Sequence, residues 1–179
     1  MHDLVELIRI SPKILLDIRY ATSNNFTGQI VYSSLRCFLL HKTAVRLHRV
    51  QLELEKMGLG LKVFDGYRPP SAQEIFWRLV PNTRYVADPK IGSKHTRGAS
   101  VDLTLVRGTQ ELLMPTDFDD FTEKASRNYS GGSKEALMNR DFLEQAMKSQ
   151  GFIPYEHEWW HYDDPDWKDC PLLDVAVPS

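Results

Sequence analysis

Residues 155–161, Tyr-Glu-His-Glu-Trp-Trp-His, contain the pattern H-E-x-x-H between His157 and His161. In zinc proteases that carry this pattern, it lies on a helix, so that both histidines share one face and the glutamate between them acts as the base. A helical stretch would supply two metal ligands from one element, whereas an extended stretch would supply one. The conformation of this stretch therefore decides both the fold and the chemistry.

The surroundings of the stretch favour an extended chain. Pro154 precedes it, Pro165 follows it, and the aromatic residues between them are of types enriched in strands. In one class of zinc proteases the pattern continues as H-x-x-G-x-x-H and supplies a third ligand. That continuation is absent here, because His161 is followed by Tyr-Asp-Asp-Pro. The sequence therefore predicts one metal ligand here, and the others must come from elsewhere.

The segment 93–102, Ser-Lys-His-Thr-Arg-Gly-Ala-Ser-Val-Asp, is the best partner. Asp102 lies on the polar row of an alternating strand, and His95 precedes an Arg-Gly turn that would fold the chain back toward that strand. Together with His161 they offer two imidazole nitrogens and one carboxylate, a set suited to Zn²⁺ with one position left for water. The alternative is that Asp102 caps a turn and His95 is a surface residue.

The remaining pattern predicts a mixture of strands and helices in irregular order. Strands are expected at 15–20, 61–67 and, half-buried, at 98–106, with a turn at 23–28. Helices are expected at 36–57, from a capping box at Ser71 through Leu79, and from Ser133 to Gln150. We expect an α+β fold, with helices packed on a central antiparallel sheet, as a single compact domain over residues 1–179.

Composition narrows the class of protein. The chain is 42% hydrophobic and 26% charged with a net charge of −2, which argues against nucleic acid or an anionic membrane as the main partner. No apolar run approaches the ~20 residues of a membrane span. Acidic residues near the start and the two cysteines, Cys37 and Cys170, lead us to expect a cytoplasmic protein without disulfides. A periplasmic location is the alternative if a signal peptide has been removed. The sequence gives no oligomeric state.

Four ordered motifs carry a family resemblance: DIRYATSNNFTG (17–28), DGYRP (65–69), SKHTRGASVDLTL (93–105) and EWWHY (158–162). Together they resemble the D-alanyl-D-alanine dipeptidases, the VanX-like zinc enzymes, over nearly the whole chain. The resemblance implies a zinc-dependent dipeptidase that holds one Zn²⁺ per chain and hydrolyses D-Ala-D-Ala. The chain departs from the family at two places. The stretch between the helix expected to end at Leu79 and Ser93 is shorter than in the antibiotic-resistance members, and Lys94 stands where a small residue is common.

The resemblance also implies roles for single residues. It assigns zinc binding to His95, Asp102 and His161, the catalytic base to Glu158, transition-state stabilisation to Arg68, contacts with the substrate ammonium group to Tyr20 and Asp119, and a lining position to Ser93. His157 matches no ligand. Arg68 has a second possible role, pairing with the substrate carboxylate.

Two rival functions remain open in the sequence. A D,D-carboxypeptidase or peptidoglycan peptidase of the same zinc group would have an open groove, whereas a dipeptidase needs a crowded pocket closed at both ends. A zinc-stabilised binding module would keep the metal but would need neither Glu158 nor Arg68. The dipeptidase reading sets a further condition: Glu158 and His161 face opposite sides of an ideal strand, so they share a site only if Trp159-Trp160 forms a bend.

Overall fold

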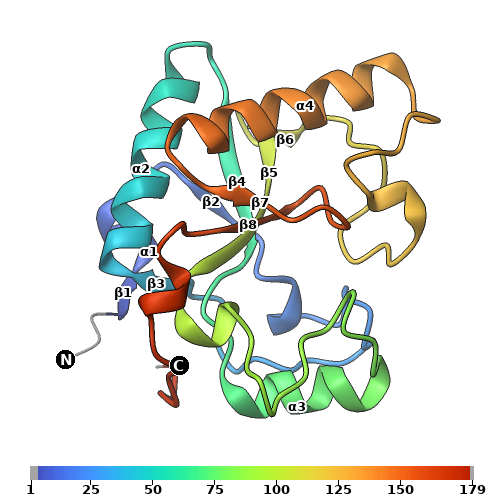
Figure 1. The fold of residues 1–179 in the computed structure, drawn as a ribbon. Coiled ribbons are helices and arrows are strands. Elements are labelled where there is room, and N and C mark those ends of the chain that lie inside the picture. Colours follow the sequence, from blue (N-terminus) through green and yellow to red (C-terminus); the bar gives the residue numbers. More distant parts are fainter. Residues whose placement is uncertain (1–3, 178–179) are drawn as a thin grey trace.

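The computed structural model describes residues 4–177, and most of its strands form one sheet. The strands are β1 (Leu4–Glu6), β2 (Leu15–Leu16), β3 (Phe38–Leu40), β4 (Gly60–Asp65), β5 (Ser100–Arg107), β6 (Gln110–Glu111), β7 (Ile153–Pro154) and β8 (His161–Asp163). The main sheet has six strands in the order β2-β4-β5-β8-β7, with β6 paired to β5, while β1 and β3 pair separately (Figure 1).

Helices cover this sheet unevenly. The helical elements are α1 (Leu7–Ile10), α2 (His41–Glu55), α3 (Pro70–Leu79), α4 (Lys134–Ser149) and the short 3-10 turns η1 (Arg19–Ala21), η2 (His95–Arg97), η3 (Glu123–Ala125) and η4 (Trp167–Asp169). The long helices α2 and α4 pack on each other and against β4 and β5, whereas α3 lies apart from both (Figure 1). Among residues 4–177, no helix has the length and apolar character needed to cross a membrane.

The predicted α+β fold is confirmed. Every neighbouring pair in the main sheet is antiparallel except β2 and β4, which run parallel, so the sheet is mixed. In the central pair, Asp102 of β5 stands opposite His161 of β8, and Ser100 stands opposite Asp163. This register brings segments about sixty residues apart in sequence to one point at the end of the sheet.

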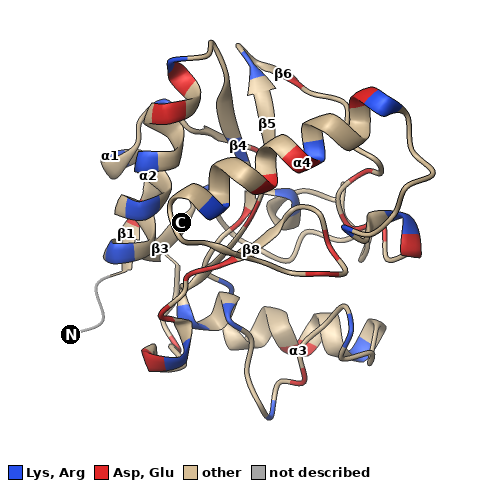
Figure 2. Cartoon of the chain, turned by 45° about the horizontal axis from the view of Figure 1, so that its top comes forward, with Lys and Arg blue, Asp and Glu red and all other residues tan. Residues whose placement is uncertain are grey.

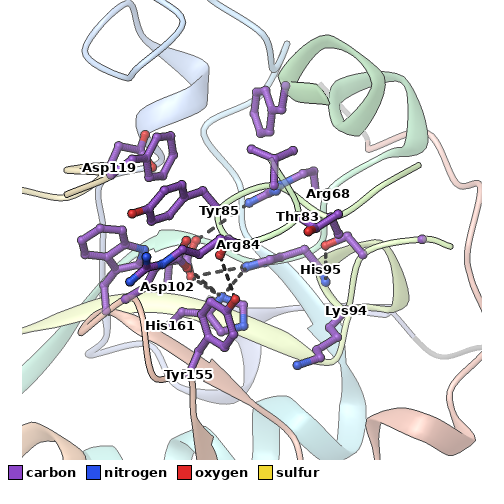
Figure 3. Close-up of a pocket in the computed structure, with 18 of the residues that line it drawn as sticks. Arg68, Thr83, Arg84, Tyr85, Lys94, His95, Asp102, Asp119, Tyr155 and His161 are labelled. Atoms are coloured by element: carbon purple, nitrogen blue, oxygen red, sulfur yellow. Dashed lines mark hydrogen bonds and ion pairs between the residues drawn. The ribbon is translucent and has the colours of Figure 1, made fainter. Parts of the chain in front are cut away.

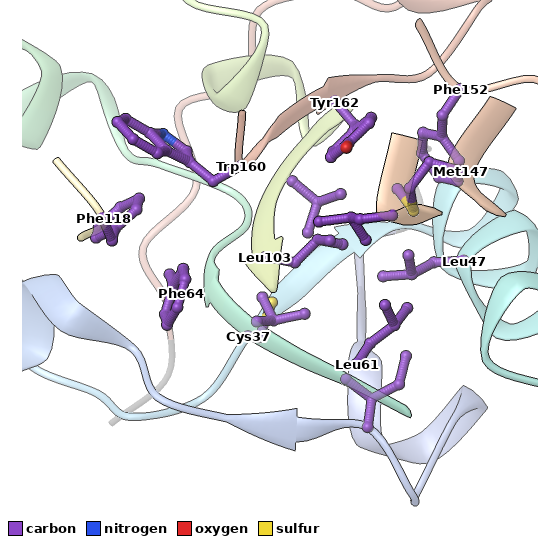
Figure 4. Close-up of a cluster of buried hydrophobic side chains, with 14 of the residues drawn as sticks. Cys37, Leu47, Leu61, Phe64, Leu103, Phe118, Met147, Phe152, Trp160 and Tyr162 are labelled. Carbon is purple, nitrogen blue, oxygen red and sulfur yellow. The ribbon is translucent and has the colours of Figure 1, made fainter. Parts of the chain in front are cut away.

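The core lies between the sheet and the two long helices. Leu103 of β5 is buried with Leu47 of α2, Met147 of α4 and Tyr162 of β8 (Figure 4). The prediction that 98–106 is only half-buried is wrong: every residue of β5 except Arg107 is buried, including its polar row. Near Asp102 that row is covered by the segment around η2, whose His95 Nε2 lies 3.4 Å from Asp102 Oδ1.

Local boundaries differ from the prediction where tertiary pairing decides them. Helix α2 begins at His41 instead of residue 36, because Phe38–Leu40 pairs with β1. The strand predicted at 15–20 ends at Leu16 and gives way to η1. Helix α3 begins at Pro70, whose fixed φ suits a first helical position, so Ser71 falls inside the first turn and caps nothing.

Helix α4, by contrast, has a side-chain cap. The Ser133 hydroxyl accepts a hydrogen bond from the backbone N–H of Ala136 at 3.1 Å. We expect Ser133→Ala to lower the free energy of unfolding by about 1 kcal/mol, because it leaves that N–H without its partner. Urea denaturation measures this change. Ser71→Ala is the matched control and should change stability by less than about 0.5 kcal/mol; an equal loss in both variants would contradict the capping assignment.

Candidate active site

Two imidazoles and one carboxylate converge at the end of the central strands (Figure 3). His161 Nδ1 lies 2.9 Å from Asp102 Oδ1, and His95 Nε2 lies 3.1 Å from His161 Nδ1 and 3.4 Å from Asp102 Oδ1. All three side chains are buried, and within the described part of the chain no other group of three such ligands gathers this closely. The sequence-predicted ligand set therefore does come together in space.

His95 reaches the cluster because the chain turns sharply after it. Gly98 has φ +64°, and a Cβ there would lie 2.8 Å from Leu4 Cδ2, so only glycine fits this turn without strain. The Gly98 carbonyl accepts a hydrogen bond from Leu40 N at 2.9 Å, which ties the turn to β3. The fold-back expected from the Arg-Gly sequence is present.

The outer nitrogen of each imidazole has its own partner. His95 Nδ1 donates to the Gly66 carbonyl at 2.8 Å, and His161 Nε2 lies 2.8 Å from Asp163 Oδ1. Such contacts orient metal-binding histidines and leave the inner nitrogens, His95 Nε2 and His161 Nδ1, facing the cluster. Asp163 was missed in the sequence, although its position two residues after His161 on one strand puts both side chains on the same face.

The cluster fits a zinc ion. A tetrahedral ion with ligand bonds of about 2.0–2.2 Å sets its ligand atoms roughly 3.3–3.6 Å apart. The three separations here, 2.9, 3.1 and 3.4 Å, come close to that spacing. Two imidazoles and a carboxylate also match the donor types that zinc prefers.

The electrostatics of the metal-free cluster favour a cation. Burial lowers the pKa of His161, but Asp163 and Asp102 outweigh it and raise the value to about 10. Burial would raise the pKa of Asp102, yet His95 and His161 hold it well below its usual range. The His161 imidazole therefore favours its positive form between two carboxylates, which is the position that suits a cation.

Arg68 is fixed beside the cluster. Its Nη2 donates to Asp65 Oδ2 at 2.7 Å and lies 3.9 Å from Asp102 Oδ2, while its Nη1 donates to Gln73 Oε1 at 3.0 Å. Asp65 is also fixed, because Tyr32 donates its hydroxyl to Oδ1 at 2.9 Å. Asp65 lies in the DGYRP motif, but no role was predicted for it.

The stretch 155–160 is a turn that joins β7 to β8, so H-E-W-W-H is not a helix. Its geometry supplies the bend that Glu158 needs: His161 N donates to the Glu158 carbonyl at 3.3 Å, and Glu158 Oε2 lies 3.8 Å from His161 Nδ1. The Trp159 and Trp160 indoles are both buried, and Trp160 lies among the core side chains (Figure 4), which holds the bend against the core. His157 is not part of the cluster. Its ring packs edge-on against the ring of Tyr155, with 5.4 Å between the ring centres.

Glu158 is buried, and burial raises its pKa to about 8, although His161 acts in the opposite direction. A buried carboxyl group with a raised pKa close to a candidate metal site is a common feature of a catalytic base.

Asp119 and Tyr20 meet at another side of the same pocket. The Tyr20 hydroxyl donates to Asp119 Oδ1 at 2.9 Å. Burial raises the pKa of Asp119 to about 7, and the hydrogen bond from Tyr20 opposes this rise. Among the described non-glycine residues, Asp119 alone has a positive φ, of 64°. Asp117 and Asp120 are not among the described residues that line the pocket, whereas Asp119 is.

The pocket measures about 260 Å³ and places Asp119 and Lys94 on different sides of the cluster (Figure 3). Lys94 Nζ lies 2.5 Å from Asp163 Oδ2, so it supports the carboxylate that orients His161. Ser93 lines the pocket, and its hydroxyl accepts a hydrogen bond from His95 N at 3.1 Å.

Acidic residues gather at this point of the molecule. Asp65, Asp102, Asp163 and Asp164 are buried near the ends of β4, β5 and β8, whereas acidic and basic side chains are interspersed on α2 and α4 (Figure 2). Buried carboxylates of this kind need cationic partners.

Comparison with known proteins identifies the family of this chain. The family described as D-ala-D-ala dipeptidase matches residues 1–177. A D-alanyl-D-alanine dipeptidase of Escherichia coli is 35% identical over 173 residues, covering 96% of this chain and 89% of the relative. One from Enterococcus faecalis is 34% identical over 168 residues, covering 82% and 83%.

Among solved structures, a mutant of the vancomycin resistance D,D-pentapeptidase VanY in complex with Zn(II) overlaps with a TM-score of 0.46 and 17% identity. The overlap covers 89% of this chain and 87% of the other, but the likeness is too slight to add to the assignment. The family match over nearly the whole chain, together with relatives above 30% identity, confirms the resemblance carried by the four motifs: the chain belongs to the D-alanyl-D-alanine dipeptidase family.

Proposed function

We propose that this protein is a zinc-dependent dipeptidase that hydrolyses D-Ala-D-Ala. The observation that carries the proposal is the meeting of His95 Nε2, Asp102 Oδ1 and His161 Nδ1 beside Glu158 in one pocket. Relatives named D-alanyl-D-alanine dipeptidase support the substrate. The pocket, at about 260 Å³, lies at the small end of the range for ligand sites, which suits a dipeptide better than a longer chain.

The three converging side chains would hold the zinc ion. Bound zinc lowers the pKa of a coordinated water to about 7 and polarises a carbonyl oxygen. Gly66 and Asp163 would keep the two imidazoles in the required orientation through their outer nitrogens.

Glu158 would act as the base. Its carboxylate would accept a proton from the attacking water and return it to the nitrogen of the leaving D-alanine, a step that typically contributes ~10²–10⁴-fold in rate. The metal-free pKa of about 8 would fall when a cation occupies the neighbouring cluster, which leaves the group ionised and able to accept that proton at neutral pH.

Arg68 would stabilise the negative charge that develops on the scissile carbonyl oxygen. Its three nitrogens are all held, Nε and Nη2 by Asp65 and Nη1 by Gln73, so the guanidinium is positioned before the substrate arrives. Its Nη2 lies 3.9 Å from a carboxylate oxygen of Asp102, and this nearness to the cluster favours the oxyanion role over pairing with the substrate carboxylate.

Tyr20 and Asp119 would hold the free ammonium group of the substrate. A dipeptide with a free amine would form a charge-assisted hydrogen bond there, whereas a peptide acylated or extended at its N-terminus would leave the buried Asp119 carboxylate without a cationic partner. Ser93 and Lys94 line another part of the pocket, where the rest of the dipeptide would lie.

Substrate selection tests the proposal directly. D-Ala-D-Ala should be hydrolysed, N-acetyl-D-Ala-D-Ala should not, and a chelator should abolish the activity until zinc is restored. L-Ala-L-Ala measures how strictly the pocket selects configuration. Release of D-alanine, followed by chromatography, is the readout. Cleavage of the acylated peptide at a comparable rate would favour a carboxypeptidase, and an absence of any hydrolysis by the zinc-loaded protein would leave only a binding module.

Three single variants separate the ligands from the base. We expect His161→Ala to lose bound zinc, His157→Ala to keep one equivalent, and Glu158→Gln to keep zinc while kcat falls ~10²–10⁴-fold. Zinc content after gel filtration and steady-state kinetics give both quantities. If the His157 variant lost zinc and the His161 variant kept it, the result would instead support His157 as a metal ligand, as in the helical H-E-x-x-H pattern. Near-normal kcat in Glu158→Gln would refute the base.

The ammonium site predicts a pH dependence of KM. Asp119, with its pKa raised to about 7, is ionised above that pH, while a substrate amine stays protonated up to about pH 8. KM should therefore fall as pH rises from 6 to 7.5. In Asp119→Asn, KM should be at least about tenfold higher and should change little over that range. A wild-type slope that persists unchanged in this variant would assign the titration to another group.

A further inference from the structure

The turn that carries Glu158 is held by one arginine outside the cluster. Arg127 follows η3, and its side chain is only 8% exposed. Its Nε donates to the Tyr155 carbonyl at 2.7 Å, and its Nη2 lies within hydrogen-bond distance of the carbonyls of Glu158, Trp159 and His161, at 3.2, 3.1 and 3.0 Å. One guanidinium thus contacts four carbonyl oxygens of a seven-residue stretch.

The opposite side of the guanidinium is fixed as well. Its Nη1 lies 3.1 Å from the Tyr162 hydroxyl and 3.3 Å from Glu144 Oε2 of α4, and its Cζ lies 4.5 Å from the centre of the Tyr162 ring. The backbone N–H of Arg127 also donates to the Glu156 carbonyl at 2.9 Å. Arg127 therefore ties the turn to both β8 and α4.

The turn needs such a contact because two of the four carbonyls have no backbone partner among the described residues. The Glu158 carbonyl accepts a hydrogen bond from His161 N at 3.3 Å and the His161 carbonyl accepts one from Tyr155 N at 3.1 Å, whereas the carbonyls of Tyr155 and Trp159 accept from Arg127. A planar guanidinium presents five N–H groups in a fixed arrangement, so it can serve several carbonyls at once, whereas a lysine ammonium acts as a single point.

We propose that Arg127 is a positioning residue, which sets the Glu158 carboxylate at its distance from His161 by fixing the carbonyls of the turn between them. It reaches His161 and Glu158 only at their backbone carbonyls and does not line the substrate pocket, so it acts through the backbone. The catalytic consequence rests on the proposed function, whereas the effect on the turn does not.

The first test is kinetic. Arg127→Ala and Arg127→Lys should each lower kcat for D-Ala-D-Ala by about 10²-fold, because a displacement of about 1 Å costs that much, while KM stays within about threefold. Tyr20 and Asp119 are held by each other, so the ammonium site should persist. Arg127→Lys keeps the positive charge, so it can be used for the kinetic test if Arg127→Ala does not fold.

Arg140→Ala is the matched control. Arg140 is also 8% exposed and donates to a backbone carbonyl, that of Tyr129 at 2.7 Å, but it contacts no residue of the turn. It should lower the melting temperature and leave kcat within about twofold of the wild type. A kcat loss in Arg140→Ala equal to that in the Arg127 variants, or normal kcat in both Arg127 variants, would overturn the proposal.

The second test uses metal-free protein and needs no substrate. Hydrogen–deuterium exchange of a peptide covering 155–162 should be at least about tenfold faster in both Arg127 variants than in the wild type, and unchanged in Arg140→Ala. Unaltered exchange in the Arg127 variants would overturn the proposal even if the enzyme is active. Faster exchange confined to this peptide would support it even if D-Ala-D-Ala proved not to be the substrate.

Discussion

The register between β5 and β8 is the constraint on which the rest of the site depends. It sets Asp102 opposite His161 and Ser100 opposite Asp163, so one pair brings two candidate metal ligands together and the other places the carboxylate that contacts an imidazole. A slip of one residue would turn Leu103 toward the pocket and Asp102 toward the core. Exposing a buried leucine costs about 1.5–3 kcal/mol, so packing of the apolar face also protects the geometry of the polar one.

Burying so many charges creates a second requirement, which is compensation. Arg68 is paired with Asp65, and Lys94 is paired with Asp163, so these two buried carboxylates beside the cluster each have a cationic neighbour. At the cluster itself, a protonated His161 compensates the carboxylates. Asp163 and Asp102 raise the pKa of this imidazole to about 10, against the effect of burial. A metal ion would replace that proton, so ion binding is expected to release it.

The pattern H-E-x-x-H shows how far a local signal can mislead. In a helix, residues four apart are neighbours, and both histidines would bind one ion. Here the same letters form a turn between two strands, so the spacing that matters is the one from Glu158 to His161. The prolines and aromatic residues pointed away from a helix, but the shape of the turn depends on Arg127 and on the burial of both tryptophans.

The sequence by itself determined the α+β class, the start of α4 near Ser133, the family and the residue types that gather at the site. Those features depend on local periodicity and on short ordered motifs, which are written in contiguous residues. Only the tertiary structure decided the start of α2, the burial of both faces of β5 and the supporting roles of Asp163 and Arg127. The reason is physical: periodicity tells which side chains share a face, but what covers that face depends on elements that are distant in the chain.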